Sequence, residues 1–171
     1  GGQVAHRARA RAEIRSRRVN NSGTLVDRQL EAGHGDKVAI RCAGEQVTYA
    51  QLYERICAVG NTLAELGVGR EDRVLMILDD SPTFAALFLG AMRMGAVPAP
   101  VSFLDTTENF HHYARDSYAK LIVAEDALLE RLPDGAMGRS EFESRLIAGE
   151  RPPADTHPDD MAFWLFSGGS T

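Results

Sequence analysis

The chain has 171 residues and a formal net charge of −5, with 44% hydrophobic and 25% charged residues. This length and composition predict about one globular domain with a sizeable core, and they argue against a disordered or fibrous protein. No apolar run approaches the about 18 residues that cross a membrane, so we expect a soluble protein without membrane association. Cys42 and Cys57 show neither CxxC spacing nor neighbouring metal ligands, which predicts reduced thiols and a cytoplasmic location.

The first 18 residues form a basic arm that holds six arginines and one glutamate. If the arm were helical, Arg7, Arg11, Arg15 and Arg18 would share one face and could attract nucleic acid or anionic lipid. An Arg-rich, acid-poor start also has some likeness to a transit peptide. However, no aromatic residue is interleaved for base stacking, and the Gly-Gly start is typical of an expression-derived tail. We therefore expect residues 1–18 to be a basic arm or such a tail, without nucleic-acid binding.

From Val19 onward, turn and cap signals divide the chain into short elements. Residues 37–42 and 46–47 predict two strands of a hairpin, joined by a turn at Ala43 and Gly44. A long amphipathic helix follows the hairpin directly. Its start carries a capping box of Thr48 with Gln51, and Gly67 ends it.

The run RVLMIL at residues 73–78 predicts a strand that is covered on both faces. Ser81 and Pro82 then form an N-cap and N1 pair, which predicts a helix to about Met94 that is buried nearly all round. Gly95 ends that helix. Further strands are expected at 96–101, 120–124 and 161–166, a linker at 151–160, and helices opened by Asp105 with Glu108, from about Glu125 to Arg131, and from Ser140 with Glu143 to Gly149.

Strands that alternate with helices indicate βαβ crossovers between parallel strands. The predicted fold class is therefore α/β, with a mainly parallel layered sheet and helices on both faces.

Ligands of open parallel sheets gather beyond the carboxyl ends of the strands. Asp79 and Asp80 follow one strand and could hold a metal or act as acid and base. Their place just before a helix gives a simpler explanation, because carboxylates stabilise helix N-termini. We therefore predict no metal site in this chain.

The end of the chain, SGGST, offers a second candidate after a predicted strand. Glycines let successive backbone N–H groups turn toward one anion, and the hydroxyls of Ser167, Ser170 and Thr171 add donors for phosphate oxygens. The stretch lacks the lysine and spacing of the familiar P-loop. From these residues alone, a phosphate-binding loop and a flexible turn are equally acceptable.

Three stretches together favour phosphate binding. They are VDRQLEAGHGDKVAI, the region from VTYAQL through AVPAPV, and DDMAFWLFSGGST, in this order. Residues from about 19 to 171 resemble the start of an adenylate-forming enzyme, the superfamily of acyl-CoA synthetases, luciferases and peptide-synthetase adenylation domains. The resemblance is strongest to benzoate-CoA ligases and related aryl-CoA ligases. The last stretch is similar to the first half of the family's phosphate-binding motif, matching it at Phe166, Ser167, Gly169, Ser170 and Thr171 and departing from it at Gly168.

This resemblance implies an ATP-dependent ligase that forms an acyl-adenylate from a carboxylic acid and then transfers the acyl group to CoA. It implies ATP, Mg²⁺ and CoA as cofactors, and benzoate or a similar aryl acid as substrate. The nucleotide-binding residues would be Ser167, Gly168, Gly169, Ser170 and Thr171. Residues 19–171 would be the N-terminal segment of the large domain, truncated in the phosphate-binding loop.

The family's magnesium ligand and catalytic lysine would then lie outside this chain, so we expect no catalytic residue within it and no ligase activity from the chain alone. Two alternatives stay open: an adenylation domain that loads a carrier protein, and a non-catalytic nucleotide-binding or interaction module. An incomplete sheet edge would favour a homodimer or association with the rest of the enzyme.

Overall fold

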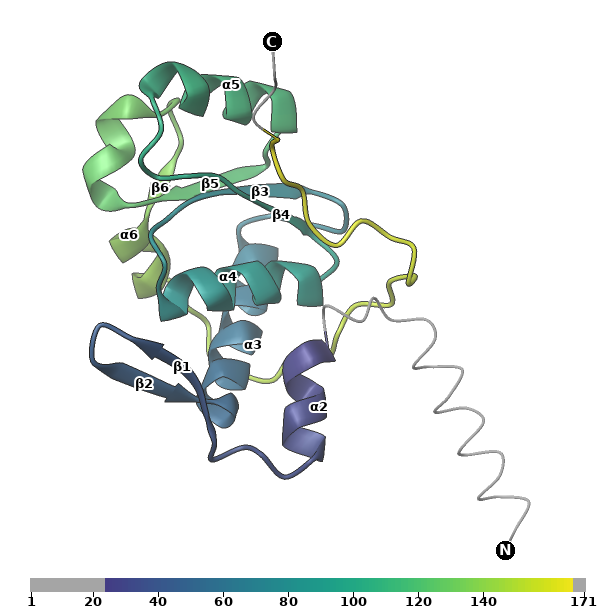
Figure 1. The fold of residues 1–171 in the computed structure, drawn as a ribbon. Helices are drawn as coiled ribbons and strands as arrows, with labels where there is room; N and C mark the ends of the chain where they lie inside the picture. The colour runs from purple at the N-terminus through teal and green to yellow at the C-terminus, as the bar shows by residue number, and fades with distance from the viewer. Residues whose placement is uncertain (1–23, 168–171) are drawn as a thin grey trace, which may run out of the picture.

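The structure is a computed structural model that describes residues 24–167 (Figure 1). The predicted basic arm, residues 1–18, and the loop residues 168–171 lie outside the described residues. In chain order the elements are α2 (Leu25–Glu31), β1 (Val38–Cys42), β2 (Glu45–Thr48), α3 (Tyr49–Glu65), β3 (Arg73–Ile77), α4 (Pro82–Arg93), β4 (Val97–Pro100), α5 (Thr107–Ser117), β5 (Leu121–Ala124), the 3₁₀ helix η2 (Asp126–Arg131), β6 (Met137–Gly138) and α6 (Arg139–Ser144).

The predicted hairpin is confirmed. Strands β1 and β2 pair antiparallel, and Ala43 and Gly44 make the turn with φ of 47° and 85°. Helix α3 follows with the expected capping box, since the Thr48 side chain accepts from Gln51 N and Gln51 Oε1 accepts from Thr48 N. Gly67 has a φ of 78°, the left-handed conformation expected just after a helix.

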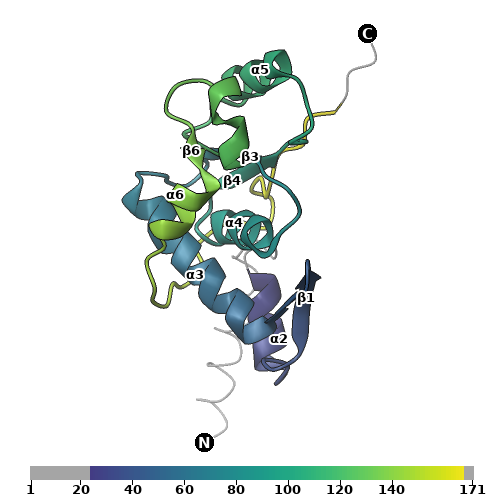
Figure 2. The same ribbon diagram turned by 90° about the vertical axis from the view of Figure 1, so that its left-hand side faces the viewer.

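Strands β4, β3, β5 and β6 form a four-stranded parallel sheet in that order, which confirms the predicted fold class. The central strand β3 is covered on both faces. Val74 and Met76 pack into the core beside α3 and α4, whereas Leu75 and Ile77 pack into the core that contains Phe110 of α5. Figure 2 shows these layers, with α3 and α4 on one side of the sheet and α5 on the other.

Helix α4 begins as predicted, with Ser81 Oγ accepting from Phe84 N and Pro82 in the first turn. It crosses α3 at close range, because Gly90 lies against Val59 and the backbone of Ile56. Arg93 in its last turn is also buried, at 2% exposure. Helix α4 therefore lies in the middle of the fold, as its apolar sequence indicated.

Two predicted helix starts are wrong. The N-cap of α5 is Thr106, whose hydroxyl accepts from Asn109 N, and not Asp105. The Asp105 carboxylate instead accepts from Thr106 N and from the side chains of Asn109 and Tyr113. Helix α6 begins after Gly138 because Ser140 is bonded to Asp126 through its hydroxyl and its N–H.

Two other helical predictions need correction. Helix α6 ends at Ser144, five residues before the predicted stop at Gly149. The segment that follows takes an irregular path along α3. The side-chain amide of Asn61 on α3 donates to the carbonyls of Ile147 and Gly149 and holds the segment there. Residues 126–131 form a 3₁₀ helix instead of the expected short α-helix.

The expected strand at 161–166 is absent, although the segment is extended and runs past β4 toward α5 (Figure 1). Trp164 N donates to Pro98 O at 3.0 Å, the one backbone hydrogen bond between this segment and β4 among the described residues. Val97 and Val101 donate their N–H groups toward β3, so the alternate residues Pro98 and Pro100 face the outer edge. Proline has no N–H, and β4 therefore offers this segment acceptors but no donors.

Candidate functional site

A hollow lies at the carboxyl ends of β3 and β4, where ligands of parallel sheets gather. Its volume is about 460 Å³, and we call it the edge hollow. Its walls are formed by residues after β3, residues at and after β4, one residue each of α4 and α5, and the end of the 161–167 segment. The lining residues are Leu78, Asp80, Phe84, Pro100, Val101, Ser102, Phe103, Asp105, Tyr113, Leu165 and Phe166.

The extended segment brings the root of the SGGST stretch to this hollow. Exposure alternates along residues 161–167, with Trp164 and Phe166 half-buried and Phe163 and Leu165 exposed. Phe163 contacts Phe88 of α4 with ring centroids 5.5 Å apart. Ser167 follows Phe166 directly and is exposed. The SGGST stretch therefore starts at the carboxyl edge of the sheet, beside the edge hollow.

Aromatic rings fix that root in place. The ring of Phe166 lies 4.6 Å from the ring of Tyr113 on α5, and 5.8 Å from Trp164 in a stacked arrangement. Aromatic pairs at such distances contribute about 0.5–1.5 kcal/mol beyond the area they bury. These ring contacts hold the segment in place where a ladder of backbone hydrogen bonds is absent.

Asp105 holds the other side of the hollow. Its carboxylate accepts from Asn109 Nδ2 at 2.5 Å, from the Tyr113 hydroxyl at 2.7 Å and from Thr106 N at 2.8 Å. The hydrogen bonds from Asn109 and Tyr113 lower the pKa of Asp105, and the bond to Asp105 raises the pKa of Tyr113. At neutral pH Asp105 is therefore a carboxylate and Tyr113 a neutral phenol, so the Tyr113 hydroxyl donates and Asp105 accepts.

Asp79 and Asp80 are exposed. Asp80 N donates to Asp79 Oδ1 at 2.7 Å, and Asp79 N donates to Glu125 Oε1 at 3.1 Å. Within residues 24–167, no group of three or more His, Cys, Asp or Glu side chains could hold a metal ion. These two aspartates thus stand before the N-terminus of α4, next to its cap Ser81.

Of the five predicted nucleotide-binding residues, Ser167 is described and lies beside the edge hollow. Gly168, Gly169, Ser170 and Thr171 lie outside the described residues. The sequence reasoning missed Tyr113 and gave Asp105 the role of a helix cap. Asp105 and Tyr113 are eight residues apart and form no recognised motif, so only the fold shows that they line one hollow together with Phe166.

No helix in the described range is long and apolar enough to cross a membrane. The described part of the chain combines a parallel α/β sheet with a serine- and glycine-rich stretch that starts at its carboxyl edge. The fold is that of a parallel α/β protein, a class in which ligands gather beyond the carboxyl ends of the strands.

Comparison with known proteins identifies the family. Residues 26–171 match the family described as "AMP-binding enzyme". The chain belongs to this family, which confirms the resemblance to adenylate-forming enzymes.

Among similar proteins, a 4-hydroxybenzoate–CoA/benzoate–CoA ligase of Rhodopseudomonas palustris is 28% identical over 91% of this chain and 32% of its own length. A benzoate–CoA ligase of Thauera aromatica is 32% identical over 90% of this chain and 32% of its own length. A crystal structure of a benzoate CoA ligase from Burkholderia xenovorans LB400 matches 84% of this chain and 32% of its own, with a TM-score of 0.71 and 26% identity. The chain thus spans about a third of the length of the curated relatives it matches.

Proposed function

We propose that this chain works as the N-terminal part of an ATP-dependent carboxylate–CoA ligase. In the first step a carboxylate oxygen attacks the α-phosphorus of ATP, and an acyl-adenylate forms as pyrophosphate leaves. In the second step the CoA sulfur attacks the acyl carbon, the thiol proton is released, and AMP leaves. The parent enzyme would be an acid–thiol ligase, and residues 19–171 would belong to its large domain.

The position of Ser167 carries this proposal. The serine starts a stretch of hydroxyl and glycine residues at the carboxyl edge of a parallel sheet, where phosphate-binding loops occur. We assign Ser167, Gly168, Gly169, Ser170 and Thr171 to the polyphosphate of ATP. Charge develops on the departing pyrophosphate, and backbone N–H and hydroxyl donors at that point stabilise it.

Gly168 stands where the family motif has a hydroxyl residue. The substitution removes one donor and gives the backbone more conformational freedom, so we propose weaker phosphate contacts than the motif would otherwise make. Mg²⁺ would add charge neutralisation on the phosphates when bound. Residues 24–167 contain no group of three or more His, Cys, Asp or Glu side chains that could hold a metal ion, so we assign no magnesium-binding residue among them.

The substrate that we propose is benzoate or a similar aryl acid. Support comes from the names of the benzoate- and hydroxybenzoate–CoA ligases, at 28% and 32% identity. The match to acetyl-coenzyme A synthetase of Streptomyces avermitilis at 35% identity makes short aliphatic acids the competing class. The free thiols of Cys42 and Cys57 support a reducing, cytoplasmic setting.

The test is ATP–pyrophosphate exchange by the complete ligase, with benzoate, 4-hydroxybenzoate and acetate as substrates. We expect exchange that depends on an aryl acid, and thioester formation that depends on added CoA. Adenylate formation without CoA turnover would instead indicate an enzyme that loads a carrier protein. The 171-residue chain alone should show no exchange. If it produced acyl-adenylate, this would contradict the expectation that the catalytic residues lie outside it. A complete protein that exchanges pyrophosphate with none of these acids would refute the proposal.

A further inference from the structure

Helix α5 meets the root of the SGGST stretch through a relay of three side chains: Asp105, Tyr113 and Phe166. Asp105 precedes α5, Tyr113 lies in its middle, and Phe166 ends the extended segment. All three line the edge hollow. One contact of the relay is a hydrogen bond of 2.7 Å, and the other is a ring contact with centroids 4.6 Å apart.

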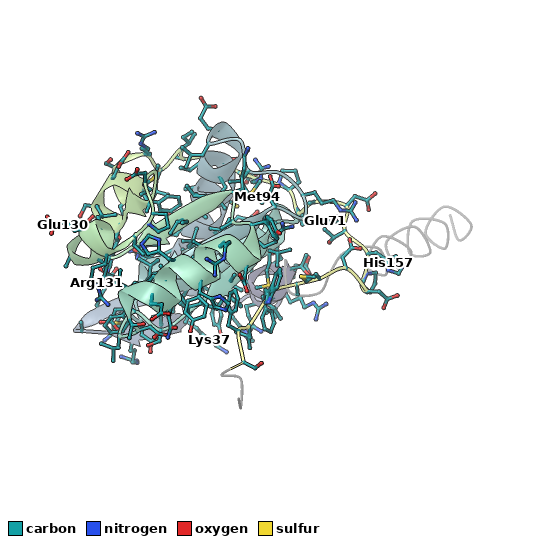
Figure 3. The ribbon with its side chains drawn as sticks, turned by 90° about the horizontal axis from the view of Figure 1, so that it is seen from above. Lys37, Glu71, Met94, Glu130, Arg131 and His157 are labelled. Carbon is teal, nitrogen blue, oxygen red and sulfur yellow. The ribbon has the colours of Figure 1, made fainter. Side chains whose placement is uncertain are left out.

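The Asp105 end of the relay is held from several directions. Both carboxylate oxygens are engaged, Oδ1 by Thr106 N and Asn109 Nδ2 and Oδ2 by the Tyr113 hydroxyl. The backbone carbonyl of Asp105 also accepts from the Arg131 guanidinium at 2.5 Å. Figure 3 labels Arg131 at the end of η2, beside α5. The acceptor that Tyr113 meets is therefore fixed to both α5 and η2.

The hydroxyl of Tyr113 donates to Asp105 at 2.7 Å, and this bond sets the position of the ring. The same ring contacts Phe166 at 4.6 Å with an interplanar angle of 47°. On another side Phe166 stacks on Trp164 with an interplanar angle of 15°. Phe166 is thus held between two aromatic rings, one of which is anchored to the sheet through Trp164 N and Pro98 O.

The segment needs this support because β4 provides acceptors without donors on the facing edge. Trp164 supplies one backbone hydrogen bond, two residues before Phe166. Between this bond and Ser167, Phe166 contacts Tyr113 and so connects the segment to α5.

We propose that Tyr113, oriented by Asp105, is a positioning residue for phosphate binding. It fixes Phe166, and through Phe166 it fixes where Ser167 begins the phosphate-binding stretch. The inference rests on the proposed function, because it assigns a phosphate ligand to that stretch. Tyr113 itself does not bind the ligand, since Asp105 occupies its hydroxyl. Loss of the hydroxyl should weaken phosphate binding through added freedom at the loop root, with little change in the fold.

Trp164 provides the measurement. It is the single tryptophan of the chain and stacks on Phe166. We would titrate the 171-residue chain with inorganic pyrophosphate and follow tryptophan fluorescence, with sodium sulfate at matched ionic strength as the anion control. The wild-type chain should give a saturable response to pyrophosphate that sulfate does not reproduce.

Tyr113→Phe keeps the ring and removes the hydroxyl. We expect the Kd for pyrophosphate to rise about threefold to tenfold, less than the full worth of a hydrogen bond to a charged group, because Tyr113 acts on the ligand only through Phe166. Tyr118→Phe is the matched control, because Tyr118 ends the same helix and is 79% exposed. Thermal unfolding of each variant separates a positioning effect from loss of the fold. Phe166→Leu should give a similar rise in Kd if Tyr113 acts through that ring.

Each outcome decides one of the two proposals. An unchanged Kd in folded Tyr113→Phe, with a normal wild-type response, overturns the positioning role and leaves the proposed function standing. A wild-type chain that shows no pyrophosphate-specific response overturns phosphate binding by this stretch and the positioning role with it. An equal rise in Kd for Tyr118→Phe would show that the effect is not specific to the relay, and it would also overturn the inference.

Discussion

The guanidinium of Arg93 lies 2.6 Å from the carboxylate of Asp27, and this ion pair joins the end of α4 to α2. The Arg93 side chain is 2% exposed. Its Nε also donates to the carbonyl of Arg151 at 2.7 Å, and its guanidinium lies 5.0 Å from the ring centroid of Tyr53. Burial would lower the pKa of Arg93, but the hydrogen bond and charge of Asp27 outweigh it and raise that pKa. The Arg93 side chain therefore connects α4 to α2 and to Arg151, which precedes the segment that leads to the candidate site.

Asp27→Asn should be strongly destabilising, because it leaves a buried guanidinium without its counter-charge. We expect a loss of about 2–3 kcal/mol in the free energy of unfolding, below the full value for a buried pair since Asp27 is partly exposed. Urea denaturation measures this loss. The matched control is Glu141→Gln, which breaks an exposed pair with Arg145 and should cost less than about 0.5 kcal/mol. Equal losses for the two variants would contradict the role assigned to Arg93.

The crossing of α3 and α4 makes a second prediction. A Cβ on Gly90 would lie 2.6 Å from Val59 Cγ1 and 3.0 Å from the carbonyl oxygen of Ile56. Gly90→Ala should therefore push the helices apart and cost about 1–3 kcal/mol, despite the better helix propensity of alanine. Thermal unfolding reports the change as a lower Tm.

Gly35→Ala is the control for Gly90→Ala. An added Cβ there meets Leu30 and Ala50 at 3.7 and 3.8 Å, which is ordinary contact. We expect a Tm close to that of the wild type. If Gly90→Ala also left the Tm unchanged, the helices would not cross as closely as the structure has them.

Much of this fold follows from local sequence signals. Thr48 with Gln51 and Ser81 with Pro82 opened their helices as predicted, because caps depend on residues three or four apart. The central strand β3 was readable from its continuous apolar run, since both of its faces are covered.

The errors occurred where contacts outside the local cap and turn patterns decide the structure. Residues 161–166 have a strand-like sequence, but the prolines of β4 remove the donors that a ladder requires. Asp105 fits a helix cap locally, and Thr106 takes that role because Tyr113 and Asn109 engage the carboxylate. Arg93 gave no signal of its partner, which lies 66 residues earlier in the chain. The phosphate-binding assignment came from resemblance, because SGGST alone does not distinguish a loop from a turn.

The Asp105–Tyr113 bond predicts a pH dependence. The folded chain lowers the pKa of Asp105 below its usual 3.8, so the carboxylate adds stability above about pH 4 that is lost as pH falls through the folded pKa. The folded chain raises the pKa of Tyr113 above 10.0, so the phenol adds stability below about pH 10 that is lost as pH rises further. Asp105→Asn should lower the free energy of unfolding at pH 7. The difference in this free energy between the variant and the wild type should become smaller toward about pH 3.

Urea denaturation at a series of pH values measures that difference. Asp134→Asn serves as control, because Asp134 lies exposed in the turn before β6. The difference between Asp134→Asn and the wild type gives, at each pH, the effect of removing an exposed carboxylate, and the Asp105→Asn curve is compared with it. A parallel pair of curves for Asp105→Asn and the wild type would show that the carboxylate is not held as described.

The one-sided edge of β4 predicts an uneven pattern of amide hydrogen exchange along the last segment. Trp164 N donates to Pro98 O, whereas the amides of Phe163 and Leu165 donate no backbone hydrogen bond within the described part of the chain. The Trp164 amide should therefore exchange at least about tenfold more slowly than those two amides. The Val101 amide, which donates to Met76 O at 3.0 Å inside the sheet, is the internal reference and should be the slowest of the four. Residue-resolved exchange by NMR makes the comparison within a single sample. Equal protection of Phe163, Trp164 and Leu165 would require donors and acceptors on both edges of the segment, and it would contradict the explanation that the prolines of β4 prevent a ladder.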